Sequence, residues 1–418
     1  MKKPILLLFF AFALGLVSCE KNDDSKYADY LVATPIKMSK AEFEQGVDVE
    51  PPTPVQVSGK IYAYKDYIFI NDKNIGVHVV DNTDPTSPHK IAFIKIPGNV
   101  DISIKDDYLY ADSLTDLVVL DISDIHDIKL KSRLKNVLYN NVIWPAEADF
   151  FEWEDIDYEN EVLVGWTTTT ERRLISEYQD RFQGGDFATD MMFANSAAAE
   201  STTGQGGSLA RFKIVDDFLY AVDSHNINIF NISDLDHPID LEDVYAGFDI
   251  ETIFNKDQYL FLGSMSGMFI YDISSPATPT FVSEFHHGTA CDPVVVDGDY
   301  AYITLRGGNF CGATESGLFI VDISNISAPT LKISYPMEGP YGLGVKDEKL
   351  FVCDGKAGLK VYDKTDVAHL VSLNHFKDID TFDVIPLQNS LLMVGDKVLT
   401  QYEYLDESIR LLSTLKLN

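Results

Sequence analysis

A six-residue pattern that ends in Asp or Asn recurs along the chain and constrains the fold more than any other feature. The clear copies are GVHVVD, DLVVLD, NINIFN, GMFIYD, GLFIVD and GLKVYD, and a weaker copy, VLTQYE, ends near Tyr402. The clear copies close at Asp81, Asp121, Asn231, Asp272, Asp322 and Asp363, at spacings of 40, 110, 41, 50 and 41 positions. A period of this length is typical of one supersecondary unit repeated along a chain.

The neighbours of each copy indicate a unit of four short antiparallel strands. An alternating strand such as YLYAD or YAYIT lies about ten residues upstream, after a hairpin turn such as Asp106-Asp107 or Asp297-Gly298, and a further short apolar strand comes before that turn. After the closing Asp come a Ser/Asp/Pro-rich loop and a fourth strand. Seven such units predict an all-β, seven-bladed β-propeller. The alternative, a β-solenoid, has shorter repeats and parallel strands.

The copies GVHVVD, DLVVLD and GLFIVD resemble the LVIVD-repeat family of bacterial extracytoplasmic propellers, and the resemblance covers most of residues 55–417. It implies a propeller fold outside the cytoplasm. The family is known mainly as a repeat architecture, so it implies little about activity. We expect the strand Leu411 to Leu417 to complete the last blade without an exchange of strands between the first and last copies.

The N-terminus has the features of an exported lipoprotein. Lys2 and Lys3 precede an apolar run that is too short to span a membrane well, and Leu16-Val17-Ser18-Cys19 resembles a lipobox. We predict a signal peptide at residues 1–18, lipid attachment at Cys19, and a flexible, proline-containing tether at 19–54. A buried cysteine at the end of an apolar helix is the alternative. The acidic residues after Cys19 resemble an export tag of outer-membrane lipoproteins, so the expected location is the outer membrane, on its periplasmic or its cell-surface side.

The charge of the chain narrows the classes of partner. Its 65 acidic and 33 basic residues give a formal net charge of −32. Such a surface repels nucleic acid and anionic lipid headgroups, so the sequence predicts no nucleic-acid partner and membrane contact through the lipid anchor alone.

The 110-residue spacing indicates an insertion at residues 138–207, between the second and third blades. Its first part alternates aromatic and acidic residues and returns through EVLVGWTTTT, which predicts a long β-hairpin; its end, Gly204 to Gly207, predicts a flexible loop. All three tryptophans, Trp144, Trp153 and Trp166, lie in it. They are candidates for binding a glycan, peptide or protein, with the alternative that they fix the hairpin to its own blade.

Strand direction predicts that the unusual features gather on one rim. The insertion, the loop that contains Cys311, and the ends of the inner strands all fall on it. Cys291 and Cys311 lie on this rim and are candidates for a disulfide, whereas Cys353 lies within a strand and is expected to be a buried apolar residue. Seven carboxylates are expected around the channel mouth as candidate binding residues: Asp101, Asp112, Asp223, Glu251, Asp292, Asp354 and Asp383. Asp is also common at strand ends simply because it caps turns.

Two classes of function fit these features. The favoured one is a non-enzymatic cell-envelope protein that binds a glycan, peptide or protein through this rim. The alternative is a propeller-type glycoside hydrolase or lyase that uses paired carboxylates. No Ser/His/Asp set, Cys/His set or metal spacing is present, so we predict no catalytic or metal-binding residues. No cofactor is predicted, and a calcium ion among the rim carboxylates stays open as an alternative.

Overall fold

The computed structural model describes residues 26–138, 145, 148–152, 157, 159–176, 203–286, 293–307 and 316–418. Six of the residues singled out above lie outside this part of the chain: Cys19, Trp144, Trp153, Cys291, Asp292 and Cys311. The predictions about lipid attachment, the disulfide and two of the three tryptophans therefore stay predictions.

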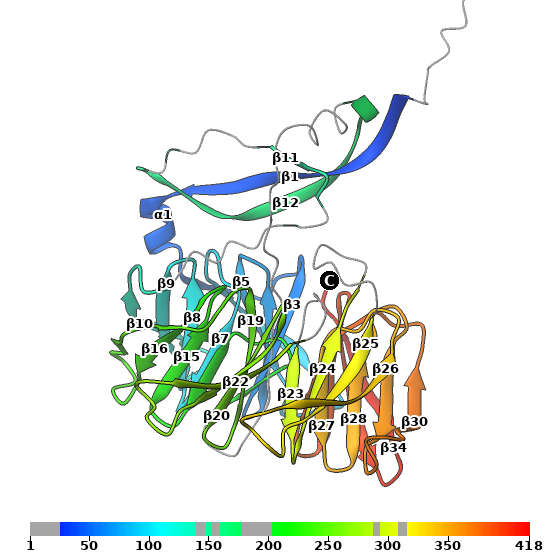
Figure 1. Ribbon diagram of the computed structural model, residues 1–418. Helices are drawn as coiled ribbons and strands as arrows, with labels where there is room; N and C mark the ends of the chain where they lie inside the picture. Colours follow the sequence, from blue (N-terminus) through cyan, green and yellow to red (C-terminus); the bar gives the residue numbers. More distant parts are fainter. Residues whose placement is uncertain are drawn as a thin grey trace, which may run out of the picture.

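The described chain is almost entirely β-structure, and seven of its sheets repeat the four-strand antiparallel unit (Figure 1). Sheet 1 contains β3 (Ser58–Tyr64), β4 (Tyr67–Asp72), β5 (Gly76–Asp81) and β6 (His89–Lys95). Sheet 2 contains β7 (Ile102–Lys105), β8 (Tyr108–Ser113), β9 (Asp116–Asp121) and β10 (Lys129–Leu134). Sheet 3 contains β14 (Phe212–Val215), β15 (Phe218–Val222), β16 (Asn226–Asn231) and a divided outer strand, β17 (Ile239–Asp240) and β18 (Val244–Tyr245).

The C-terminal half repeats the unit without interruption of the strand order. Sheet 4 contains β19 (Ile250–Lys256), β20 (Tyr259–Ser264), β21 (Gly267–Asp272) and β22 (Thr280–His286). Sheet 5 contains β23 (Val294–Asp297), β24 (Tyr300–Leu305), β25 (Gly317–Asp322) and β26 (Thr330–Pro336). Sheet 6 contains β27 (Leu343–Lys346), β28 (Lys349–Cys353), β29 (Leu359–Asp363) and β30 (Val371–Phe376). Sheet 7 contains β31 (Thr381–Pro386), β32 (Ser390–Gly395), β33 (Val398–Leu405) and β34 (Ser408–Lys416).

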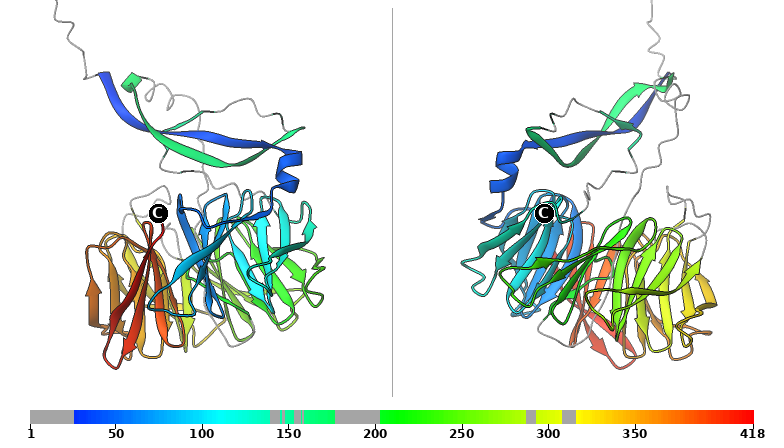
Figure 2. Two further views of the ribbon diagram at one scale, coloured as in Figure 1. Left: turned by 180° about the vertical axis from the view of Figure 1, so that it is seen from behind. Right: turned by 60° about the vertical axis from the view of Figure 1, so that its left-hand side comes forward.

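The first strand of each unit faces the centre of a ring. Contacts run from β3 to β7, and then through β14, β19, β23, β27 and β31 back to β3. The sheets stand side by side around this centre, as both views of Figure 2 show. The all-β class and the propeller architecture expected from the repeat are therefore confirmed.

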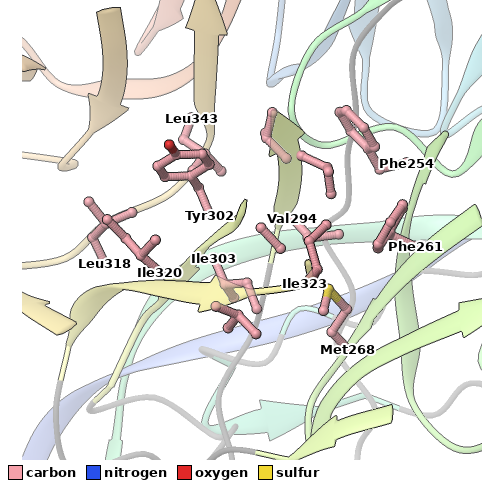
Figure 3. Close-up of a cluster of buried hydrophobic side chains, with 14 of the residues drawn as sticks. Phe254, Phe261, Met268, Val294, Tyr302, Ile303, Leu318, Ile320, Ile323 and Leu343 are labelled. Atoms are coloured by element: carbon pink, nitrogen blue, oxygen red, sulfur yellow. The ribbon is translucent and has the colours of Figure 1, made fainter. Parts of the chain in front are cut away.

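Apolar side chains fill the spaces between neighbouring sheets. Figure 3 shows one such core, in which Phe254 and Phe261 of sheet 4 pack near Val294 and Tyr302 of sheet 5, and Leu343 of sheet 6 completes the cluster. All five side chains are at most 3% exposed. Both faces of the second and third strands are buried in this way, as in β4, β5, β8 and β9, which explains why these parts of the repeat have apolar residues on both faces.

The closing Asp of each repeat has a structural role at the loop after the third strand. Its carboxylate accepts a hydrogen bond from the backbone N–H two residues later, as from Thr83 to Asp81 (2.8 Å) and from Ser324 to Asp322 (3.1 Å). Hydrogen bonds from the side-chain hydroxyl groups of Thr83 and Ser324, together with those from their backbone N–H groups, hold the pKa of both carboxyl groups below the usual range. The Asp therefore fixes the turn, because a short polar side chain can replace a backbone acceptor there.

The ring closes without an exchange of strands between its first and last sheets. As expected, β34 completes sheet 7, and all four strands of that sheet come from residues 381–416. Hydrogen bonds join the first and last repeats instead: Val55 N–H donates to Leu417 O (2.8 Å), and Gln401 Nε2 donates to Asn82 Oδ1 (2.6 Å).

The expectation of a flexible tether is wrong for residues 27–50. β1 (Tyr27–Ser39) is a long strand, α1 (Lys40–Gln45) follows it with a capping box between Ser39 and Glu42, and β2 (Asp48–Glu50) adds to the outer edge of β6. Among the described residues, no helix is long and apolar enough to cross a membrane.

The predicted hairpin within the insertion is also wrong. β11 (Phe150–Phe151) and β12 (Glu161–Leu174) do not pair with each other in the described chain. Both pair with β1, which lies between them, and β1 and β12 are paired along their full length. We call β1, β11 and β12 the cover sheet; it lies above one end of the ring (Figure 1). An alternating strand such as β12 can pair with a neighbour in sequence or with a distant strand. The pairing that buries its apolar face is the one that forms.

Candidate functional site

In each four-strand unit, the loop between the second and third strands lies at one end of the ring. We call this end the upper rim, and the cover sheet lies on it. Leu114, in the loop between β8 and β9, belongs to the apolar cluster of the cover sheet, and Gly165 of β12 lies against Asn74, in the loop between β4 and β5. The part of the insertion that belongs to the cover sheet is therefore on the rim that strand direction predicted.

Trp166 is a structural residue of the cover sheet. Its side chain is 8% exposed and packs edge-to-face on Phe151, with ring centroids 5.4 Å apart. It joins the apolar cluster that includes Ala33, Phe43 and Leu114. The prediction that Trp166 contacts a ligand is wrong, because the chain's own residues cover the indole ring.

Residues Thr203–Arg211, which we call the channel segment, occupy the space that the inner strands enclose. Thr203 forms a bridge with Lys105, and β13 (Gln205–Gly206) pairs with the inner edge of β3. Farther along, Gly207 N–H donates to Ile61 O (3.0 Å), and Ser208 N–H donates to Asp383 Oδ1 (2.7 Å). The segment thus contacts inner strands of sheets 1, 2 and 7.

Glycine makes this close approach possible. A Cβ atom at Gly204 would lie 2.2 Å from the ring of Tyr62, and one at Gly207 would lie 2.1 Å from Asp383 Oδ2. The expectation that Gly204 to Gly207 form a flexible loop is therefore wrong. A glycine run permits both a mobile linker and tight backbone packing, and the surroundings decide between them.

The described carboxylates expected around an open channel mouth are buried. Each is at most 3% exposed: Asp101, Asp112, Asp223, Glu251, Asp354 and Asp383. The expectation that they present an accessible binding ring is wrong. The channel segment and the loops of the upper rim cover them, and most of their oxygens already accept hydrogen bonds from the chain.

Two buried cations lie among the carboxylates of sheets 2 to 4. Lys60 Nζ lies 3.1 Å from Asp101 Oδ2, which also accepts hydrogen bonds from the backbone N–H groups of Arg211 and Phe212. The Arg211 side chain is 3% exposed, and the negative charges of Asp112, Asp223, Asp101 and Glu251 partly offset the effect of burial, which lowers the pKa of its guanidinium. These cations were not recognised in the sequence, because only the fold brings them beside the acids.

Burial raises the pKa of two of these carboxyl groups. The pKa of Asp112 is about 6, although its Oδ1 accepts hydrogen bonds from Val100 N–H (2.8 Å) and Asp101 N–H (2.9 Å). The pKa of Asp383 is about 7, against the opposing effect of its hydrogen bonds from Ser208 and Val384. Burial dominates at both positions because no water reaches the charge.

Asp223 and Asp354 cap loops of the upper rim. Asp223 Oδ1 accepts hydrogen bonds from the backbone N–H groups of His225 (2.7 Å) and Asn226 (2.8 Å). Asp354 accepts hydrogen bonds from the N–H groups of Glu338 (3.0 Å) and Gly339 (2.8 Å) and pairs with Lys360.

Across the described residues, no group of three or more His, Cys, Asp or Glu side chains has the arrangement of a metal site. Calcium at the rim stays untested, because Asp292 lies outside the described chain.

Exposed aromatic side chains lie on the upper rim of sheet 3. Tyr245 is 59% exposed and Phe248 is 66% exposed, although both belong to a connection held by hydrogen bonds. Phe248 packs edge-to-face on His225 (centroids 5.4 Å apart) and on Tyr245 (6.0 Å). We call these three residues the aromatic cluster. The sequence offered a signal for it, because YAGFD at 245–249 places two aromatic residues in one short connection.

The ring of four-stranded sheets defines the chain as a β-propeller protein of repeated sequence units. The model of the LVIVD repeat matches four segments of it, residues 55–92, 98–135, 253–286 and 287–336, which contain all or most of sheets 1, 2, 4 and 5. No curated protein matches the sequence.

Several solved structures align with most of the chain at low identity. Hsv2p of Kluyveromyces lactis is 12% identical over 86% of this chain and 99% of its own, with a TM-score of 0.46. A protein from Lactobacillus plantarum is 14% identical over 78% of this chain and 84% of its own, with a TM-score of 0.48. PorZ, a surface component of the type-IX secretion system of Porphyromonas gingivalis, is 12% identical over 87% of this chain and 39% of its own, with a TM-score of 0.49. At these values the likeness carries no functional inference.

Proposed function

We propose that this chain is a lipid-anchored protein of the outer membrane that binds a protein partner through the upper rim. The propeller of LVIVD repeats supports a binding or structural role. The aromatic cluster is the observation that carries the choice of surface. Its two exposed rings lie on the rim that also bears the cover sheet.

The aromatic cluster is preorganised for contact. Ala246 N–H donates to His225 O (2.7 Å), and Ile250 N–H donates to Ser224 O (3.0 Å), which ties the connection to the loop beside it. Tyr245 pairs with Asn226 in the strand ladder. Exposed aromatic side chains on an ordered backbone lose little conformational entropy on binding, and such residues often dominate the energy of protein interfaces.

The geometry favours a protein over a glycan. The rings meet at interplanar angles of 79° and 84°, which produces a faceted apolar projection rather than a flat platform for a sugar ring. The nearby polar groups are also engaged, because His225 Nδ1 contacts Gly247 O (3.3 Å) and Asp223 caps the loop. A projection of this kind fits an apolar recess of a partner.

The hydrolase alternative has weaker support. Acid/base chemistry on a glycan needs two carboxyl groups that the substrate can reach. Asp101, Asp112 and Asp383 are buried next to the channel segment, and Glu251 is 0% exposed. A substrate would have to displace residues Thr203–Arg211 from hydrogen bonds with three inner strands.

Substitution of both exposed rings is expected to remove most of the binding. A photo-crosslinking amino acid at Phe248 in native cells should yield a covalent adduct with one protein. The double variant Tyr245→Ala/Phe248→Ala, which removes exposed side chains alone, should fold normally and bind that protein about tenfold or more weakly. The measurement is the dissociation constant for the purified partner.

A matched position on the opposite rim serves as the control. His369, whose side chain is 82% exposed, lies in the loop between β29 and β30 and should give no adduct. An adduct whose added mass is lost on periodate treatment, while the chain itself stays intact, would show a glycan partner instead. Equal adducts at Phe248 and His369, or unchanged affinity of the double variant, would contradict the proposed surface.

The lipid anchor has its own test. Cys19→Ser should abolish labelling by a fatty-acid probe and move the protein from the membrane fraction to the soluble fraction, because one thiol carries the first lipid chain. A Cys353→Ser variant controls for the loss of a thiol, since Cys353 is a buried free cysteine within β28. Continued labelling of the Cys19→Ser variant would remove the anchor from the proposal.

A further inference from the structure

Lys213 is a lysine of the channel wall that the ion-pair network does not use. It lies in β14 between Phe212 and Ile214, whose side chains pack in the apolar core between sheets 2 and 3. Lys213 lies between them on the opposite face of the strand, and its side chain is partly exposed. There it lines a small pocket together with Tyr62, Ser103 and the backbone of the channel segment.

The amine of Lys213 has no acidic partner in the described chain. Three other lysines with little exposed surface each have one: Lys60 pairs with Asp101, Lys360 with Asp354, and Lys364 with Asp297. Burial alone lowers the pKa of Lys213, to about 8, and no carboxylate acts on it. About nine in ten molecules therefore carry a positive charge here at pH 7. A positive charge that no carboxylate balances favours a nearby anion.

The other groups around the pocket are suited to an anion. Tyr62 Oη and Ser103 Oγ are 3.1 Å apart, and Tyr62 Oη already accepts the N–H of Ile104 (3.0 Å). Burial raises the pKa of Tyr62 to about 12, so its hydroxyl keeps its proton. Thr203 adds a third hydroxyl group. The lining thus offers an ammonium group and hydroxyl groups, and no carboxylate.

The size of the pocket limits the anion. Its free space is close to that of a single water molecule, which excludes sulfate, phosphate and larger carboxylates. We propose that Lys213 holds one halide ion, chloride under physiological conditions, inside the propeller channel. The ion would balance the charge of the lysine and fix the start of the channel segment through Thr203.

Bromide provides the probe for this site. In crystals of the wild-type protein soaked in bromide, an anomalous peak is expected within hydrogen-bond range of Lys213 Nζ. In solution, exchange of gluconate for chloride at constant ionic strength should raise the melting temperature by about 2–4 °C, because the ion binds only the folded chain. Lys213→Met, which keeps a similar length without the charge, should lose both effects.

The controls separate this site from general effects of salt. Lys356→Met removes an exposed lysine and should leave the bromide peak and the chloride dependence unchanged. Three results would overturn the proposal: bromide peaks only elsewhere, the same melting temperature in chloride and gluconate, or an equal chloride effect in Lys213→Met. The crystal and the salt exchange use the wild-type protein, so the test stands even if Lys213→Met does not fold.

Discussion

Arg211→Ala is expected to lower the free energy of unfolding by about 3–5 kcal/mol, because it removes one member of a buried charge network and leaves the others without balance. Asp101, Asp112, Asp223 and Glu251 all act on the Arg211 guanidinium, and the side chain is 3% exposed. Urea unfolding of the variant and the wild type at pH 8 measures the loss.

The loss should also depend on pH. Burial already raises the pKa of Asp112 to about 6, and loss of the positive charge of Arg211 should raise it further above that of the unfolded chain. The folded variant then binds more protons than the unfolded chain, so its stability falls as pH rises from about 4 toward the raised pKa values. The difference from the wild type should therefore be smaller at pH 5 than at pH 8.

A surface arginine provides the matched control. The Arg410 side chain is 68% exposed and pairs with Glu403 at the outer edge of sheet 7. Arg410→Ala is expected to cost about 1 kcal/mol or less, with little change between pH 5 and pH 8. A similarly small and pH-independent effect of Arg211→Ala would show that the carboxylates do not depend on this cation.

Gly358→Ala is expected to cost about 1–3 kcal/mol, because it combines backbone strain with a steric clash. Gly358 has a φ of +93°, and a Cβ atom there would lie 1.9 Å from Phe376 O on the neighbouring outer strand. Three other repeats also begin their pattern with glycine, at Gly76, Gly267 and Gly317. The repeat therefore keeps this residue where the third strand enters the sheet.

The same position in another repeat is the control for Gly358. At Gly317 the added Cβ would lie 3.0 Å from Tyr335 O, and the backbone lies outside the left-handed region. Gly317→Ala should therefore cost clearly less than Gly358→Ala in the same unfolding measurement. Equal losses at the two positions would show that the strain at Gly358 is relieved by movement of β30.

The closed channel affects the choice between the two functional classes. A propeller with an open channel offers a ligand the ends of its inner strands. Here Gln205 to Ser208 occupy that space, and Gly207 lies against Asp383. The carboxylates at this end of the channel are therefore covered by the chain itself, whereas Tyr245 and Phe248 are exposed on the upper rim.

The sequence by itself determined the architecture. Alternating strands with a period near 40 residues permit few arrangements, because each four-strand unit must bury two apolar faces against its neighbours. Strand direction also predicted that the insertion lies on the upper rim, and the contacts of Leu114 and Gly165 bear this out. Cys353 is a buried free cysteine, as its place within a strand predicted.

Only the tertiary structure decided how the irregular segments are used. The pattern of residues 161–174 allows a local hairpin as readily as pairing with β1, which lies more than a hundred residues earlier in the chain. Spacing placed Asp101 and Asp383 at one end of the inner strands, and burial decided whether they face water or the chain's own groups. Lys60 and Arg211 became their partners only through folding, because the energy of a buried charge depends on neighbours in space rather than in sequence.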